Sequence, residues 1–283
     1  MTQKNKAPLS VQGLCKYYDS FRLEDVSFTL KEGTITGFIG RNGAGKTTTL
    51  NAILTFLRPN AGEVRFFGLS MGEHADEIKR RVGFVSAGMS YYTMKKLKTI
   101  TRVCASFYPQ WDQAAYEKYM QKFQLDDSKT PAALSNGMKI KYALALALSH
   151  GAELLILDEP TSGLDPVSRE ELIEIFLSLR QAGKTILFST HVTSDLEKCA
   201  DRIIFLRQGR IAADRPYRDF AADYRLIACD GPVPAALSAL TLGVCPTRDG
   251  ATVLIRAADG PDQGRVPTLD EIMIHLEKED DTP

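Results

Sequence analysis

The chain of 283 residues lacks the features that define several protein classes. It has no net charge, because 35 Lys and Arg residues balance 35 Asp and Glu residues, whereas a general nucleic-acid binder needs a basic excess or a strongly basic face. Its longest apolar runs, Tyr142–Leu148 and Leu154–Leu157, fall far short of the roughly 20 residues that cross a bilayer. We therefore expect no nucleic-acid partner and a chain that does not itself span a membrane.

Cysteine is too scarce and too widely spaced for a disulfide framework or a zinc site. The five cysteines are odd in number, and no Cys-x-x-Cys pair occurs. The N-terminus is basic but polar, without the apolar segment of a secretory signal. These absences predict a reduced, cytoplasmic protein.

Short apolar strands alternate with helices along much of the chain, which predicts an α/β fold with a mostly parallel sheet. The strand pattern stops at about residue 89, gives way to helical segments, and returns at Glu153–Leu157. We therefore predict an α/β core formed by residues 1–88 and 151–210, with an inserted helical subdomain at residues 89–150. Residues 211–283 would form a small C-terminal accessory α/β segment with one clear strand, Ala251–Arg256, and an amphipathic helix, Thr268–Lys278.

A glycine-rich segment between a predicted strand and a predicted helix reads G-x-x-x-x-G-K-T. Its glycines allow backbone N–H groups to surround a phosphate, and the helix N-terminus adds partial positive charge. Lys46 would reach the β- and γ-phosphates, and the Thr47 hydroxyl would bind Mg²⁺. The alternative is a glycine-rich turn without a ligand. The predicted nucleotide-binding residues here are Gly40, Arg41, Asn42, Gly43, Ala44, Gly45, Lys46, Thr47 and Thr48.

A second acidic site follows the apolar run Leu154–Leu157. A buried strand would deliver Asp158 at its carboxyl end beside the phosphate loop, where this carboxylate would hold Mg²⁺. Glu159 would then polarise the attacking water as a general base. The alternative, a solvated strand terminus, does not account for the run Pro160–Asp165 that follows.

The motifs DEPTSGLD, GRNGAGKTT and Ser-Thr-His at residues 189–191 together resemble the ATP-binding cassette of ABC transporters, over about Leu9 to Gly209. The resemblance implies a P-loop NTPase (RecA-like) core that binds ATP and Mg²⁺, with Lys46, Glu159 and His191 as catalytic residues. It implies that His191 contacts the γ-phosphate and that Asp165 lies in a loop that communicates across a cassette dimer. It also implies an aromatic side chain stacked on adenine, for which Tyr18 fits best and Tyr17 is the alternative.

Two departures from the family pattern stand out. The signature Leu-Ser-Gly-Gly-Gln reads Leu134-Ser-Asn-Gly-Met138 here. It keeps Ser135 and Gly137, which the resemblance places against ATP bound to the other cassette, and similar versions occur in ABC-2-type exporters. The family glutamine expected near Ala87 is missing, which leaves Ser86 as a weak substitute.

The resemblance therefore predicts an ATP-hydrolysing subunit that powers a separate polytopic membrane permease of export type. It would pair with a second cassette, as a homodimer or a related heterodimer, and lie on the inner face of the cell membrane. The permease would contact the region Met89–Gln110, with Tyr91 and Tyr92 as candidate contacts. The alternatives are a nucleotide-sensing regulatory cassette with little hydrolysis, suggested by the missing glutamine, and a soluble non-transport ABC ATPase.

Overall fold

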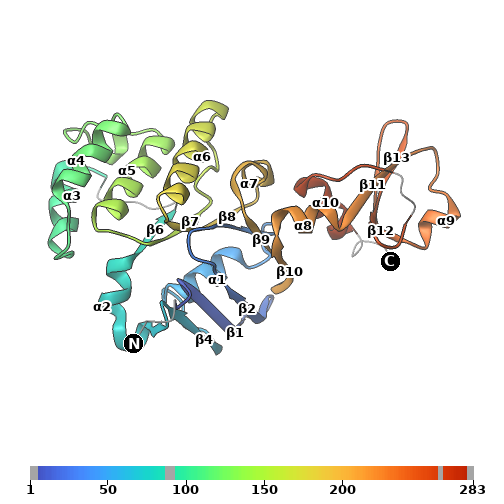
Figure 1. The fold of residues 1–283 in the computed structure, drawn as a ribbon, viewed down its shortest axis with the longest axis horizontal. Helices are drawn as coiled ribbons and strands as arrows, with labels where there is room; N and C mark the ends of the chain where they lie inside the picture. Colours follow the sequence, from blue (N-terminus) through green and yellow to red (C-terminus); the bar gives the residue numbers. More distant parts are fainter. Residues whose placement is uncertain (1–5, 87–92, 261–263, 279–283) are drawn as a thin grey trace.

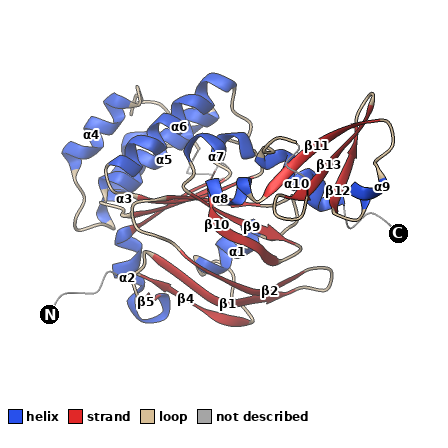
Figure 2. Ribbon diagram, turned by 45° about the vertical axis from the view of Figure 1, so that its right-hand side comes forward, coloured by secondary structure: helices blue, strands red, loops and turns tan. Residues whose placement is uncertain are grey.

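The computed structural model describes residues 6–86, 93–260 and 264–278, which form three β-sheets with helices packed around them (Figures 1 and 2). The central sheet has the strand order β10-β9-β3-β8-β7-β6. Five of these strands run parallel, and the edge strand β10 is antiparallel to β9. The predicted α/β class with a mostly parallel sheet is therefore confirmed. The strands are β3 (Ile35–Ile39), β6 (Val82–Ser86), β7 (Leu154–Asp158), β8 (Thr185–Thr190), β9 (Arg202–Arg207) and β10 (Arg210–Pro216).

Strand β7 shows why the central sheet is covered on both faces. Leu155 and Leu157 belong to the apolar core that includes helices α5 and α6, whereas Leu154 and Ile156 belong to the core that includes α1. Successive side chains of a strand point to opposite faces, so a run that is apolar at every position is buried on both sides. The helices around the sheet are α1 (Lys46–Ile53), α2 (Met71–Arg81), α3 (Leu97–Ser106), α4 (Gln113–Lys122), α5 (Asn136–Ser149), α6 (Pro166–Gln181) and α7 (Thr193–Cys199).

A second, antiparallel sheet has the order β2-β1-β4-β5. Sequence reasoning missed its strand β1, because a register shift between Val11 and Leu14 breaks the alternation of buried and exposed residues. Helix α1 ends at Ile53, and two residues later Thr55 has a left-handed backbone (φ 62°) that prevents the helix from continuing. The strands are β1 (Leu9–Tyr17), β2 (Arg22–Thr29), β4 (Ala61–Phe66) and β5 (Leu69–Ser70).

The C-terminal part holds a third sheet, in the order β11-β13-β12, at the end of the molecule opposite α3 and α4 (Figure 1). The sequence predicted one clear strand in this part, whereas the structure has the three strands of this sheet. Helix α10 packs back toward the core, where the Thr193 hydroxyl donates to Asp270 at 2.5 Å and the Leu269 N–H donates to Glu197 at 2.6 Å. The elements are α8 (Tyr217–Ala222), β11 (Tyr224–Asp230), α9 (Ala235–Ser238), β12 (Thr241–Pro246), β13 (Gly250–Arg256) and α10 (Leu269–Lys278).

None of the helices in the described ranges combines the length and the apolar character needed to cross a bilayer.

Candidate functional site

The site lies where the carboxyl ends of three neighbouring parallel strands meet, β3, β8 and β7. The chain leaves β3 at Gly40, β7 at Glu159 and β8 at His191. In a parallel sheet these loops converge on one edge, which is the usual place for a ligand. The three sequence motifs that are far apart in the chain are therefore brought together by strand order.

The phosphate loop requires glycine at two of its positions. A Cβ at Gly40 would lie 2.3 Å from the carbonyl oxygen of Leu206, so a side chain there would force the backbones apart. Gly45 precedes α1 with φ 108°, a backbone conformation that residues with a side chain rarely adopt. These glycines let the loop turn closely around the N-terminus of α1.

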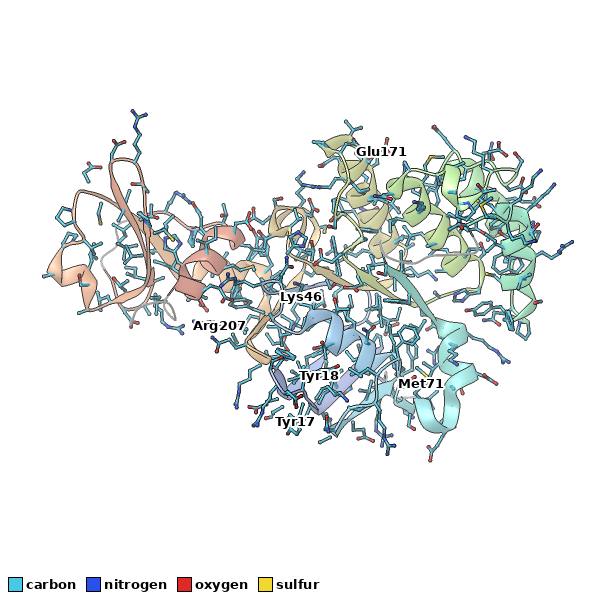
Figure 3. The ribbon with its side chains drawn as sticks, turned by 180° about the vertical axis from the view of Figure 1, so that it is seen from behind. Tyr17, Tyr18, Lys46, Met71, Glu171 and Arg207 are labelled. Atoms are coloured by element: carbon cyan, nitrogen blue, oxygen red, sulfur yellow. The ribbon has the colours of Figure 1, made fainter. Side chains whose placement is uncertain are left out.

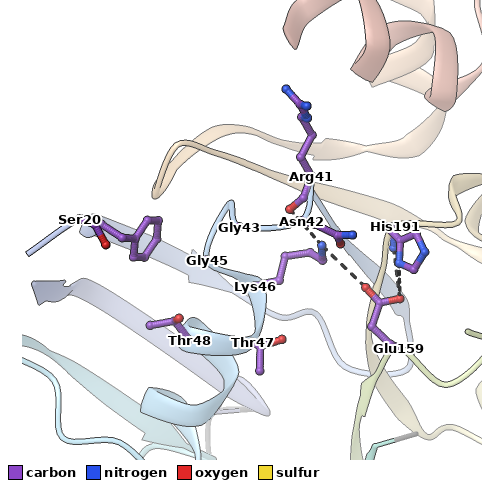
Figure 4. Close-up of a pocket in the computed structure, with 11 residues that line it drawn as sticks. Ser20, Arg41, Asn42, Gly43, Gly45, Lys46, Thr47, Thr48, Glu159 and His191 are labelled. Carbon is purple, nitrogen blue, oxygen red and sulfur yellow. Dashed lines mark hydrogen bonds and ion pairs between the residues drawn. The ribbon is translucent and has the colours of Figure 1, made fainter. Parts of the chain in front are cut away.

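Lys46 is the first residue of α1, and its ammonium group lies inside the loop. Its Nζ donates to the Gly40 carbonyl at 2.7 Å and lies 3.7 Å from a carboxylate oxygen of Glu159 (Figure 4). Burial lowers the pKa of Lys46, and the charge of Glu159 opposes that shift. A buried ammonium beside exposed loop amides is suited to binding a phosphate.

Asp158 ends β7 as a buried carboxylate. It accepts a hydrogen bond of 2.5 Å from the Ser189 hydroxyl of β8. Burial raises the pKa of Asp158, and the hydrogen bond from Ser189 opposes the rise. A carboxylate held in this way is destabilised by the loss of water, and a bound cation would relieve that cost.

Glu159 links the two halves of the site (Figure 4). One oxygen lies 3.7 Å from Lys46 Nζ, and the other lies 2.8 Å from His191 Nδ1. The backbone of Glu159 is left-handed (φ 50°), which is uncommon for a residue with a side chain, and its N–H donates to the Ser189 carbonyl at 2.9 Å. The strand end and this turn together direct the carboxylate into the pocket.

A pocket of about 580 Å³ opens above the loop (Figure 4). Tyr18, the predicted adenine contact, is not one of the described residues that line it. Tyr17 ends strand β1 and Tyr18 follows it, and both side chains are exposed (Figure 3). Phe21, which sequence reasoning missed, lines the pocket beside Gly45, and its only sequence signal is that it is an aromatic residue in the same turn. The lining residues are Ser20, Phe21, Arg41, Asn42, Gly43, Gly45, Lys46, Thr47, Thr48, Glu159 and His191.

Three predicted site residues stand apart from this pocket and are placed by helix N-termini. The Ser135 hydroxyl accepts a hydrogen bond from the Met138 N–H at the start of α5. Asp165 accepts from two backbone N–H groups at the start of α6, and the bonds from Ser168 hold the pKa of this carboxyl below its usual value. Both are N-caps of long helices. The predicted roles of Ser135, Gly137 and Asp165 in a cassette dimer stay predictions.

The donor set fits Mg²⁺. Among the described residues no group of three or more His, Cys, Asp or Glu side chains is placed to hold a metal. Mg²⁺ does not need one, because it is usually bound by one or two carboxylates together with substrate phosphates and water. Thr47 lines the pocket and Asp158 is a buried carboxylate next to it. Ser86 pairs in register with Asp158, and Ala87 lies outside the described residues.

Helix α10 lies beside the phosphate loop. The sequence predicted this helix but not its position. A second pocket of about 480 Å³ lies between α10 and the phosphate loop, and its lining includes Asn42, His191 and Ile274. Arg41 of the loop lies 3.6 Å from the Glu277 carboxylate. The C-terminal part therefore touches the phosphate loop directly.

A third, apolar pocket of about 330 Å³ is lined by the residues that follow α1, by helices α2 and α5, and by strand β6. Phe56 projects from it with 68% of its surface exposed, and Tyr108 stacks on His150 with ring centroids 4.1 Å apart. Trp111 and Phe84 also line this pocket. The predicted permease contacts Tyr91 and Tyr92 lie outside the described residues.

The comparisons with known proteins all identify the same family. The family model described as "ABC transporter" matches residues 23–162. The bacitracin transport ATP-binding protein BcrA of Bacillus licheniformis is 33% identical over 208 residues, which cover 72% of this chain and 68% of that protein. The Nod factor export ATP-binding protein I of Burkholderia lata is 34% identical over 243 residues, which cover 82% and 79%.

Solved structures agree. The structure of an ATP-binding subunit of an ABC transporter superimposes with a TM-score of 0.68 at 30% identity, over 75% of this chain and 90% of that one. A nucleotide-free ATP-binding cassette superimposes with a TM-score of 0.65 over 76% and 93%, and at 22% identity it supports the fold alone. The predicted P-loop NTPase core is confirmed by these likenesses.

Proposed function

The chain belongs to the ABC transporter family as an ATP-binding, ATP-hydrolysing subunit, and we propose that the pocket of Figure 4 is where this chain binds and cleaves ATP. The observation that supports this most is the position of Glu159, whose carboxylate lies between Lys46 and His191 at the mouth of the phosphate loop. A base and a cation at one phosphate-binding loop are groups that phosphoryl transfer to water uses, and the imidazole beside them can hold the base in place.

The chain's own groups divide the work. Lys46 exchanges Glu159 for the β- and γ-phosphates, while the loop amides and the N-terminus of α1 bind the remaining phosphate oxygens. Glu159, released from Lys46, accepts a proton from the attacking water, and His191 Nδ1 holds the other carboxylate oxygen in place. Thr47 and Asp158 would hold Mg²⁺, which spreads the charge that develops on the phosphates when it is bound.

The second half of the site would come from another cassette. Ser135 and Gly137 at the start of α5 do not line the pocket of their own chain, and the N-terminus of this 14-residue helix is a suitable anion-binding group. We therefore propose that two cassettes, identical or related, close head to tail with ATP between them. Asp165, which begins α6, would lie in the same interface.

The mechanical output would go to a separate polytopic permease at the inner face of the cell membrane. The apolar pocket below Phe56 and Trp111 offers a surface suited to a short amphipathic helix of that partner. The names of the relatives BcrA and Nod factor export protein I describe transport and export, which favours an export-type transporter over a soluble ATPase outside transport.

The test is binding of a fluorescent ATP analogue to the purified chain with Lys46→Ala. Loss of a charged donor to phosphate should weaken binding by about 10- to 100-fold. Lys118→Ala removes an exposed lysine of α4 and is the matched control. Equal affinities of the two variants would contradict the placement of ATP in this pocket.

A further inference from the structure

Three buried polar atoms without a hydrogen-bond partner gather close to the proposed ATP site. They are Thr161 Oγ1, Arg169 Nε and Asp195 Oδ2, and none of them makes a hydrogen bond of good geometry to a described residue. Buried polar groups in folded proteins are nearly always hydrogen-bonded, so each exception requires a physical explanation. The one other such atom in the described ranges is Thr36 Oγ1, so the exceptions are concentrated at this place.

Asp195 is the centre of the group. It is 1% exposed, and its Oδ2 lies 3.8 Å from Arg169 Nε, beyond the length of a hydrogen bond. Burial raises the pKa of Asp195, while the Thr161 hydroxyl and the Arg169 charge act in the opposite direction. The Asp195 carboxylate therefore has the Thr161 hydroxyl and the Arg169 guanidinium as neighbouring donors, while its Oδ2 makes no hydrogen bond of good geometry.

Each member of the group belongs to a segment that carries a proposed site residue. Thr161 follows Glu159 by two residues, and Asp195 follows His191 by four, on α7. Arg169 lies on α6, one turn after the residue that caps this helix. Helices α6 and α7 pack side by side (Figure 1). The incomplete cluster thus joins the segment of the base to the segment of the histidine.

We propose that Asp195 is a positioning residue that couples the loop carrying Glu159 to the segment carrying His191. In the nucleotide-bound state, α6 and α7 approach by about 1 Å, which is the difference between the observed ion pair and a hydrogen bond. Arg169 and Thr161 then donate to Asp195. These bonds hold Glu159 and His191 in fixed positions relative to each other. The inference rests on the proposed roles of Glu159 and His191.

The first test is steady-state hydrolysis by the full-length chain with Asp195→Asn, which keeps the size of the side chain but removes its charge. We expect kcat to fall by about 10- to 100-fold, as for a misplaced catalytic group, with KM within about 3-fold of the parent. Asp195→Glu should retain activity, because its longer side chain reaches across the 3.8 Å gap to Arg169. Asp201→Asn is the control, since Asp201 pairs with Arg180 at the opposite end of the sheet from the pocket.

Hydrogen exchange with a non-hydrolysable ATP analogue and Mg²⁺ supplies a readout independent of turnover. In the parent, protection should rise together in the phosphate loop, in residues 161–169 and in residues 192–199. In Asp195→Asn it should rise in the phosphate loop alone. Arg169→Gln, at a partly exposed side chain, should do the same if Asp195→Asn does not fold.

Two results overturn the coupling. One is a parent-like kcat and exchange pattern in Asp195→Asn, and the other is an Asp195→Glu variant that behaves like Asp195→Asn. Absence of phosphate-loop protection in the parent would instead contradict the proposed ATP site, and this inference with it.

Discussion

The two sides of the site are built differently. On the phosphate-loop side the polar groups already have partners: Lys46, which would meet ATP, donates to Gly40, and the Thr49 hydroxyl behind the loop donates to Gly45 at 2.8 Å. On the side of α6 and α7, the buried Asp195 and the half-buried Arg169 each have a buried polar atom without a hydrogen bond. A fully satisfied polar network is rigid, whereas the approach proposed for α6 and α7 would add hydrogen bonds to the incomplete one. The contrast indicates that the phosphate site is already formed, and that the segment of α6 and α7 forms its remaining hydrogen bonds only when the two helices approach.

Among the variants that compare these two sides, the largest expected effect comes from removing the charge of the buried carboxylate at their boundary. Asp158→Asn should lower Mg²⁺-dependent hydrolysis by about 100-fold or more, since metal-assisted charge stabilisation contributes several kcal/mol. Steady-state rates over a Mg²⁺ titration measure it. A variant with parent-like Mg²⁺ dependence would show that Asp158 does not hold the metal.

The pH dependence of stability gives a second prediction for Asp158→Asn. The raised pKa of Asp158 means that the folded nucleotide-free protein disfavours the charged carboxylate, so its contribution to stability is greatest at low pH and is lost as pH rises above the usual value of 3.8. Asp158→Asn should therefore raise the melting temperature near neutral pH in the absence of nucleotide. A melting temperature lower than that of the parent would indicate that the charge is stabilising there.

A smaller effect distinguishes two aromatic candidates for the adenine. Phe21→Ala should weaken ATP binding by about 10-fold, because stacking of a base on an aromatic ring contributes about 1–3 kcal/mol. Tyr18→Ala should change affinity by less than about 2-fold, since Tyr18 does not line the pocket. Calorimetry on both variants measures this. The reverse order would favour the assignment drawn from the sequence resemblance.

The smallest effect concerns the link between α10 and the phosphate loop. Glu277→Gln removes the partner of Arg41, an ion pair with an exposed arginine that contributes at most about 1 kcal/mol. ATP affinity should change by less than about 5-fold, with a larger difference at low salt than at high salt. An affinity that changes by more than this at high salt would show that α10 supports the phosphate loop through more than this ion pair.

The sequence predicted correctly those parts of the site whose residues are contiguous in the chain. The glycines of the phosphate loop and the pair Asp158-Glu159 are contiguous, and their flanking strand and helix were foreseen. Contacts that depend on tertiary packing were not foreseen. Phe21 reaches the pocket through the path of the β1–β2 turn, and Glu277 reaches Arg41 through the docking of α10. Strand β1 escaped prediction because its bulge shifts the side-chain alternation by one residue.

The most direct measurement of the central claim is a single-turnover assay of Glu159→Gln with Mg²⁺ and ATP. The chain should still bind ATP with parent-like affinity, because Lys46 and the loop are intact, and it should accumulate as an ATP-bound dimer. Its hydrolysis rate should fall by about 10²- to 10⁴-fold, the usual contribution of a general base. Parent-like hydrolysis, or a chain that stays monomeric at saturating ATP, would contradict the account.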